Sequence, residues 1–371
     1  YRRHNAGRRY VENEFFAALA ASHHSQPDAD NVRYRLRRDP RVLEALERMW
    51  PILTPAQLLR DLFGSKALIE SAAGEHLCEA EWLTLFRPRG ESFADYRWSD
   101  ADVPLLDEAY SGLGPRLDRR RKARDPEIRT FGHIVVDETQ DHTPMALRMI
   151  SRRSLNGSMT IVGDIAQATA PGAAADWDEV LNYLPTGTIE PRVRELTLSY
   201  RIPAPNLELA KKVLAVAAPD LASPKAVRSV GTPPRIVEVI GQPIAPVQSL
   251  VDRAVSMVQE ESEALGGGSV AVIAPGSLIE MVDQALQATG IDYGRATTAS
   301  RNVSGPLHPK IALVPVQLVK GLELDGTVVI EPATILEEEP QGLRALFVAL
   351  TRSTKRLAIV HARPLPRVLV D

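Results

Sequence analysis

The feature that most constrains the fold is a change of pattern near residue 131. From there to the C-terminus, short runs rich in β-branched residues alternate with segments whose apolar residues recur at helical spacing. This alternation is typical of parallel sheets, because a parallel connection needs a crossover of a dozen or more residues, usually a helix. We therefore expect an α/β fold here. The predicted strands are His133–Val136, Met159–Val162, Arg194–Leu198, Arg235–Ile240, Val270–Ala274, Ile311–Val316, Thr327–Ile330 and Arg356–Val360.

Two segments between these strands carry apolar stripes at the spacing of an amphipathic helix. The first stripe consists of Val247, Leu250, Val251, Ala254 and Val258, and the second of Leu343, Leu346, Phe347 and Leu350. Three consecutive glycines, at 266–268, predict a turn and no domain linker, since strands and helices of the same kind continue on both sides.

Residues 1 to about 125 differ from the rest, being charge-rich with few strand signals. Val11–Ser22 and Pro40–Met49 have apolar residues at helical spacing. A basic run then leads into the first strand; it consists of Arg116, Arg119, Arg120, Arg121, Lys122 and Arg124. A solvated helix end or linker accounts for such a run, and a contact with a phosphate backbone or a polymerase is the alternative.

The composition limits the possible partners. The 371 residues suffice for two or three domains, and no apolar run approaches the roughly 18 to 20 residues of a membrane span. We expect no membrane partner and no secretion signal. Cys78 is the only cysteine, which fits a reducing cytoplasm, and His23 and His24 point in different directions on a helix, which disfavours a metal site. The net charge of −3 restricts any contact with nucleic acid to a local surface.

Acidic residues follow the first predicted strand. In Asp137-Glu138-Thr139-Gln140-Asp141, carboxylates stand at the carboxyl end of a strand, where open α/β sheets bind ligands. One carboxylate can hold Mg²⁺ and the next can orient the attacking water in phosphoryl transfer. A helix N-terminus with acids that complement its dipole would contain the same residues. This segment alone does not decide between the two interpretations.

Four further segments make the chemical interpretation specific. They are Thr160-Ile161-Val162-Gly163-Asp164-Ile165-Ala166-Gln167, Leu196-Thr197-Leu198-Ser199-Tyr200-Arg201, Val319-Lys320-Gly321-Leu322-Glu323-Leu324-Asp325 and Leu346-Phe347-Val348-Ala349-Leu350-Thr351-Arg352. With the acidic segment, they resemble motifs II to VI of UvrD-like superfamily 1 helicases in order, spacing and strand context. Each residue also has an ordinary structural explanation, such as a core aromatic at Tyr200 or a helix C-terminal cation at Arg352.

The resemblance implies a nucleoside triphosphatase with two RecA-like domains, ATP or GTP as substrate, and Mg²⁺ bound by Asp137. Residues 1–125 would be a helical region attached to the first RecA-like domain, 126–190 the C-terminal part of that domain, and 191–371 the second domain. The implied catalytic residues are Glu138 (orienting water), Gln167 (sensing the γ-phosphate), and Arg201 and Arg352 (stabilising charge). The implied nucleotide-binding residues are Tyr200 at the base, Glu323 at the ribose, Lys320 and Gly321.

Departures from the motif pattern narrow the resemblance. The sequence contains no Gly-x-x-x-x-Gly-Lys-Ser/Thr, so the phosphate loop is missing and is expected upstream of Tyr1. Arg201 and Lys320 are too close for the large domain that UvrD carries between motifs IV and V. The segment 168–172 after Gln167 lacks the aromatic residues that stack single-stranded bases.

These departures, together with Trp98–Ala109 and the closing Pro364-Leu365-Pro366, resemble the HelD branch. Its members bind bacterial RNA polymerase and use nucleotide to release or recycle it, so the polymerase is the implied partner. We expect the 371-residue chain alone to be inactive. The alternatives are a UvrD-type DNA helicase or translocase in DNA repair, with DNA as the partner, and an inert polymerase-docking module.

Overall fold

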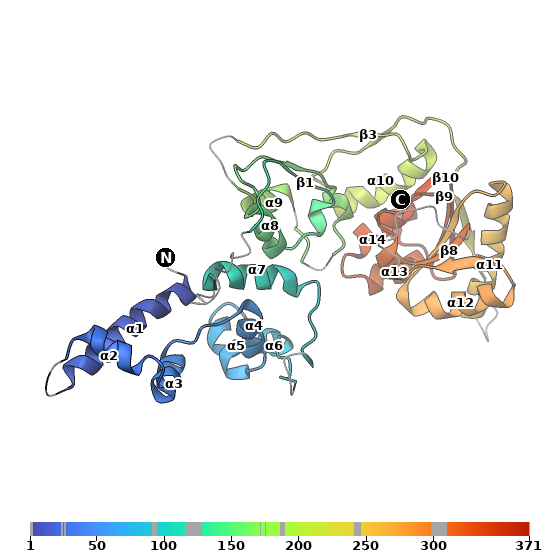
Figure 1. Ribbon diagram of the computed structural model, residues 1–371. Helices are drawn as coiled ribbons and strands as arrows, with labels where there is room; N and C mark the ends of the chain where they lie inside the picture. The colour runs from blue at the N-terminus through green and yellow to red at the C-terminus, as the bar shows by residue number, and fades with distance from the viewer. Residues whose placement is uncertain are drawn as a thin grey trace. The chain divides into compact units, whose positions relative to one another are not determined.

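The computed structural model describes most of the chain (Figure 1). The described residues are 3–23, 25, 27–90, 95–115, 128–170, 172–174, 176–185, 190–240, 246–297 and 310–370. His24 and the basic run at 116–124 lie outside them, so both interpretations of that run stay open. The chain forms two compact units. Unit 1 comprises Tyr1–Ile134, Pro144–Met159 and Tyr183–Pro185, and unit 2 comprises Val135–Thr143, Thr160–Asn182 and Thr186–Asp371.

Unit 1 consists of short helices, and no strand occurs among its described residues before position 116. The helices are α1 (His4–Ala21), α2 (Ala29–Leu36), α3 (Pro40–Met49), α4 (Pro55–Phe63), α5 (Lys66–Ala73), α6 (Glu79–Thr84), α7 (Asp102–Leu113) and α8 (Pro144–Ser151). The predicted helix at 40–49 is confirmed residue for residue. Asp39 accepts a hydrogen bond from the Arg41 amide, and Pro40 occupies the first turn, where a missing N–H costs nothing.

Unit 2 is built on a six-stranded sheet in which every described strand pairing is parallel, so the predicted parallel α/β arrangement is confirmed. The strand order is β5-β10-β9-β6-β8-β7. The strands are β5 (Arg235–Glu238), β6 (Val270–Ala274), β7 (Tyr293–Arg295), β8 (Ile311–Pro315), β9 (Leu324–Ile330) and β10 (Ser353–His361). The helices of this unit are α9 (Trp177–Asn182), α10 (Ala204–Ala217), α11 (Pro246–Ala264), α12 (Ile279–Ala288), α13 (Pro332–Glu338), α14 (Gly342–Leu350) and α15 (Arg367–Val370).

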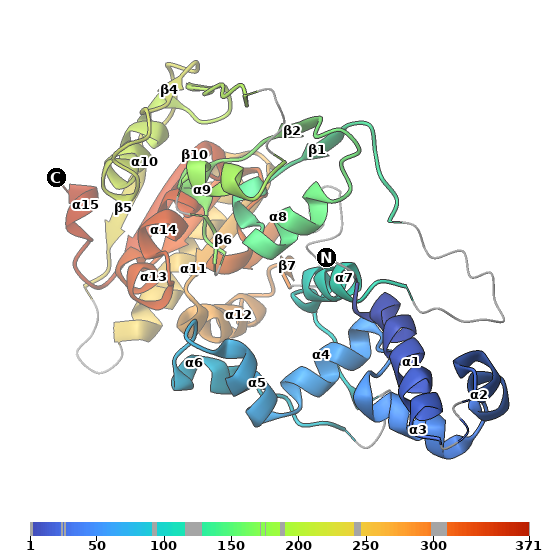
Figure 2. The same ribbon diagram turned by 90° about the vertical axis from the view of Figure 1, so that its left-hand side faces the viewer.

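Helices cover both faces of this sheet, as Figures 1 and 2 show. Alternate residues of β6 point to opposite faces: Ala271 and Ile273 pack with α10 and α14, whereas Val270 and Val272 pack with α11 and α12. All five β6 side chains are therefore buried, which explains why this strand is apolar throughout instead of alternating.

The two predicted apolar stripes face the sheet. On α11, Leu250, Val251, Ala254 and Val258 are buried, although Val247 near the start of the helix is exposed. On α14, Leu346, Phe347 and Leu350 are buried. The glycines at 266–268 form the predicted turn, and Gly266 and Gly267 have positive φ angles that favour glycine.

The structure has two further sheets, each of two short strands. β1 (Ile134–Val136) pairs with β2 (Met159–Ile161), and β3 (Leu198–Ser199) pairs with β4 (Lys225–Ala226). The strand predicted at Arg194–Leu198 is mostly wrong, because only Leu198 of that run finds a neighbouring strand. Leu196 within the run and Val193 just before it are both exposed. Residues that favour β-structure therefore do not form a strand when no neighbouring strand pairs with them. The short strands β4 and β7 were not predicted.

Among the described helices, none combines the length and the apolar character required to cross a lipid bilayer. Cys78, the N-cap of α6, is a free and exposed thiol.

Candidate functional site

The acidic segment follows β1 directly, and its second residue has a strained backbone. Glu138 has a φ of 49°, a left-handed conformation that is uncommon for a residue with a side chain. Its amide donates to Asp137 Oδ1 at 2.8 Å, and the buried hydroxyl of Thr139 donates to Val162 O at 2.9 Å. These contacts hold the turn in place after β1 and next to the end of β2. Such strain is often kept where a functional side chain has to be aimed.

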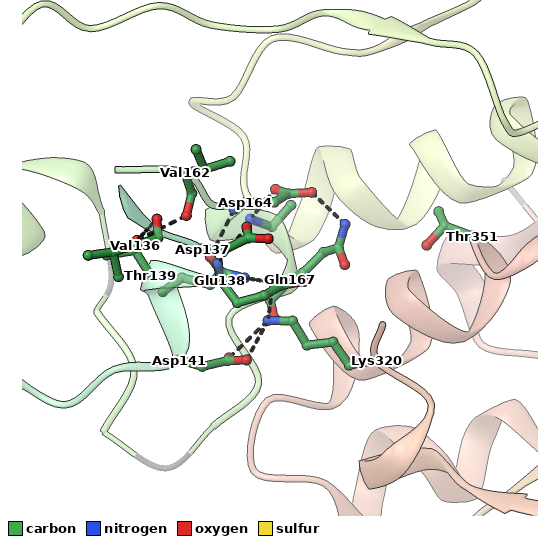
Figure 3. A network of polar contacts seen from close by, with 12 residues as sticks. Val136, Asp137, Glu138, Thr139, Asp141, Val162, Asp164, Gln167, Lys320 and Thr351 are labelled. Carbon is green, nitrogen blue, oxygen red and sulfur yellow. Dashed lines mark hydrogen bonds and ion pairs between the residues drawn. The ribbon is translucent and has the colours of Figure 1, made fainter. Parts of the chain in front are cut away.

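The amide of Gln140 joins the two strand ends. Gln140 is fully buried; its Nε2 donates to Glu138 Oε2 at 2.7 Å, and its Oε1 accepts from the Asp164 amide at 2.9 Å. Asp164 in turn accepts from Gln167 Nε2 at 2.7 Å (Figure 3). One chain of hydrogen bonds therefore links the carboxylate of Glu138 to the side chain of Gln167. No role was predicted for Gln140 or Asp164, although both lie inside the motif-like segments of the sequence.

Gly163 packs directly against the Gln140 side chain of this hydrogen-bond chain. A Cβ at this position would fall well inside contact distance of Gln140 Oε1, and 3.2 Å from both the Thr139 amide and the Trp177 ring. Gln140 cannot yield without giving up its bonds to Glu138 and Asp164. The absence of a side chain at residue 163 is therefore a packing requirement of the site.

We expect Gly163→Ala to lower the free energy of unfolding by about 1–3 kcal/mol, the usual cost of overpacking a filled site. Denaturant unfolding followed by circular dichroism measures it. Gly276→Ala is the matched control in the same unit, because its Cβ would meet neighbours only at 3.6 Å and beyond. Equal stability of the two variants would show that the Gln140 bridge adjusts freely.

Lys320 contacts the acidic segment. Its side chain is almost fully buried, and its ammonium lies 2.9 Å from Asp141 Oδ1, 2.8 Å from Gln167 O and 3.4 Å from Glu138 Oε2 (Figure 3). Gly321 follows with a φ of 79°, which turns the chain into β9. Lys320 therefore contacts the acidic segment, whereas the family resemblance predicts that it binds nucleotide. The role of Asp141 as its partner was not foreseen.

A pocket of about 330 Å³ brings together five of the predicted site residues. They are Gln167, Tyr200, Arg201, Glu323 and Arg352, and Asp164 also lines the pocket. The pocket lies at the amino ends of β9 and β10, since Glu323 precedes one strand and Arg352 precedes the other. The other four predicted residues, Asp137, Glu138, Lys320 and Gly321, do not line it.

Arg352 is the principal cation of the pocket. Its guanidinium donates to Val348 O at 3.1 Å, to Thr351 Oγ1 at 3.2 Å and to Gln167 Oε1 at 3.1 Å. All three acceptors are neutral, and no carboxylate lies within ion-pair distance of Arg352 in the described part of the chain. Burial lowers the pKa of Arg352 below its usual value; the more distant charges of Glu138, Asp164 and Glu323 oppose that shift.

The mouth of the pocket combines an ion pair with an apolar wall. Arg201 Nη1 lies 2.7 Å from Glu323 Oε1, and both side chains are more than half exposed. Leu196, Leu198 and Tyr200 alternate along one extended segment, and all three are exposed and line the pocket. These three side chains form an apolar wall beside the exposed Arg201–Glu323 ion pair.

The residues after β1 fit a single-carboxylate metal site. Mg²⁺ is commonly held by one or two carboxylates plus substrate phosphates and water, and does not need a protein cage. Asp137 is exposed and uses Oδ1 for the Glu138 amide, so Oδ2 remains for a ligand. Among the described residues, no group of three or more His, Cys, Asp or Glu side chains could hold a metal alone.

Comparisons with known proteins do not identify a family. No family model matches the chain, and no curated protein matches it. Among solved structures, the chain is similar to the C-terminal domain of a possible DNA helicase from Lactobacillus plantarum WCFS1, with 23% identity. That match covers 46% of this chain and 92% of the other, with a TM-score of 0.33, a likeness too weak to bear on fold or function.

Proposed function

We propose that the pocket binds the phosphates of ATP or GTP, and that this chain is the motor portion of a RecA-like nucleoside triphosphatase. The partner set of Arg352 is the observation behind the proposal. A guanidinium that is largely withdrawn from water, and bonded only to neutral oxygens, gains most from an anionic ligand. A γ-phosphate supplies that anion, and Gln167 already contacts the guanidinium and would sense its arrival.

Arg201 provides the second cation. Its partner Glu323 is exposed, and exposed ion pairs contribute only about 0–1 kcal/mol, so Arg201 can leave Glu323 for a phosphate at little cost. Glu323 is then free to accept from a ribose hydroxyl. The apolar wall around Tyr200 suits a nucleobase, which stacks on an aromatic ring. Charge, sugar and base therefore each have a complementary group in one pocket.

Glu138 is assigned to the attacking water. Gln140 fixes one of its carboxylate oxygens, which orients the group before substrate binds, and orientation by a fixed carboxylate is what phosphoryl transfer to water requires. Mg²⁺, when bound, would neutralise charge on the phosphate oxygens, and Asp137 is the residue that would hold it. Lys320 keeps the acidic segment against the Gln167 backbone and limits repulsion among its carboxylates.

Hydrolysis also requires a phosphate loop, which the sequence lacks. We therefore expect turnover in a protein that joins such a loop to this chain, called here the loop-containing protein. Within that proposal, the HelD branch of the UvrD-like proteins is the more specific assignment, with bacterial RNA polymerase as the partner. Two observations disfavour the DNA-helicase alternative: Ala168, just after Gln167, is fully buried and presents no stacking platform, and the net charge of −3 gives no general attraction to phosphate.

We expect the loop-containing protein to bind core RNA polymerase more tightly than a single-stranded oligonucleotide at matched, near-physiological salt. Parallel titrations measure this, with ATP and GTP hydrolysis recorded in each. Submicromolar DNA binding, strong stimulation of hydrolysis by DNA and no polymerase complex would favour the DNA-repair helicase instead. Polymerase binding without any turnover would favour the inert docking module.

A further inference from the structure

An outward surface on α2 stands apart from the nucleotide pocket and has its own chemistry. α2 lies against α1 within unit 1 (Figure 2). The attached side of α2 consists of Val32, Arg33 and Leu36, which are half-buried; Arg33 donates to Asn13 Oδ1 at 2.8 Å and pairs with Glu12. No residue of α2 is fully buried. The helix is therefore held by one narrow stripe, and the rest of its circumference faces outward.

The outward side carries one aromatic ring and several arginines. Asn31, Tyr34 and Arg35 lie at helical spacing on one face of α2, Arg37 and Arg38 follow the last residue of the helix, and all five are exposed. Tyr34 is 73% exposed, and the guanidinium of Arg37 lies 5.3 Å from the centre of its ring. We call these five residues, Asn31, Tyr34, Arg35, Arg37 and Arg38, the α2 surface.

The arginines of the α2 surface lack acidic partners. Between residues 28 and 41 the chain has five arginines and three aspartates; Asp39 pairs with Arg41 at 3.0 Å, and the exposed Asp28 and Asp30 precede the arginines. In the described part of the molecule, no carboxylate lies within ion-pair distance of Arg35, Arg37 or Arg38. An ordinary solvated helix face interleaves both signs of charge, as Arg48 and Glu44 do on α3. On α2 the one such acid is Asp30, four residues before Tyr34, and it lies outside ion-pair distance of Arg35, Arg37 and Arg38.

We propose that the α2 surface binds single-stranded nucleic acid, a site additional to the nucleotide pocket and independent of it. Arginines without acidic partners suit phosphates, which they bind through charge-assisted hydrogen bonds. The tyrosine suits an unpaired base, because a base in a duplex is already stacked and cannot lie on the ring. An acidic protein surface would satisfy the arginines but would leave the exposed ring without a role. DNA and RNA single strands share the chemistry that the surface recognises.

The test uses the 371-residue chain and fluorescence anisotropy with labelled single-stranded DNA, single-stranded RNA and duplex DNA of one length. Tyr34→Ala should weaken single-strand binding by about 5- to 150-fold, the range for losing one stacked base, while Tyr34→Phe should stay close to the original. The double variant Arg35→Ala/Arg38→Ala should weaken binding and reduce the slope of log K against log salt by about 1.4, roughly 0.7 for each lost phosphate contact. The single strand that binds more tightly, DNA or RNA, is the one that we assign as the natural ligand.

A matched control removes the same charge elsewhere in unit 1. Arg48 and Arg148 are exposed and pair with Glu44 and Glu108, so Arg48→Ala/Arg148→Ala should leave binding and salt slope unchanged. Because the basic run at 116–124 is present in every variant, the differences between variants decide the outcome. Equal losses in the two double variants, no effect of Tyr34→Ala, or binding of a labelled acidic peptide without any oligonucleotide binding would each overturn the proposal.

Discussion

Arg352→Ala is expected to lower the turnover of the loop-containing protein by about 10³- to 10⁵-fold, the effect of losing an arginine that stabilises charge in phosphoryl transfer. Arg352 is the less exposed of the pocket's two arginines and the one bonded to Gln167, whereas Arg201 pairs with the exposed Glu323, so Arg201 does not take its place. Arg352→Lys should recover only part of the rate, because an ammonium keeps the charge but cannot bond in a planar fork to phosphate and to Gln167 together. Steady-state hydrolysis of ATP and GTP measures both variants.

Arg363→Ala is the control for this substitution. Arg363 is an exposed arginine of the same unit that pairs with Glu337 at 2.6 Å and does not line the pocket. It should leave turnover unchanged, and the 371-residue chain without a phosphate loop provides the background rate. An Arg352→Ala protein that keeps the original rate and the original unfolding midpoint would remove Arg352 from the site.

Glu138→Gln is expected to reduce turnover by about 10²- to 10⁴-fold while changing nucleotide affinity little, because an amide keeps the shape but cannot align and polarise water as a carboxylate does. The structure around residue 138 should survive this substitution. The residue at 138 is held by its backbone and by Gln140, and Lys320 keeps its contacts with Asp141 and Gln167 O when the charge at 138 is removed. Rapid-quench hydrolysis and equilibrium binding of a fluorescent nucleotide separate the two quantities.

Glu337→Gln, at an exposed position of α13, removes one acidic charge from the same unit and should change neither quantity. A Glu138→Gln protein that loses affinity and rate together would indicate that Glu138 binds nucleotide or metal and does not orient water. Unchanged turnover would leave only the structural explanation of the acidic segment, a turn whose carboxylates are neutralised by Lys320.

Much of the architecture of unit 2 follows from short-range pattern. Val270–Ala274 is apolar at five consecutive positions, and a strand of that kind is stable only when both faces of its sheet are covered. The apolar stripes of α11 and α14 pack on the two faces of the sheet, so a parallel sheet with helical crossovers could be predicted from the sequence alone. The strand predicted at 194–198 was mostly wrong because a strand forms only when a neighbouring strand pairs with it, and the local sequence does not show whether such a strand is present.

The candidate site, too, has features that the sequence predicts and contacts that only the tertiary structure decides. The sequence by itself determined which side chains stand at the ends of which strands, because Glu138 and Gln167 each follow a β-prone run within a few residues. Only the tertiary structure decided that Arg352 meets Gln167, that Lys320 lies on Asp141 instead of lining the pocket, and that the Gln140 amide joins Glu138 to Asp164. These pairs are up to 185 residues apart, and their contacts arise from how the intervening strands and helices pack, which no local periodicity specifies.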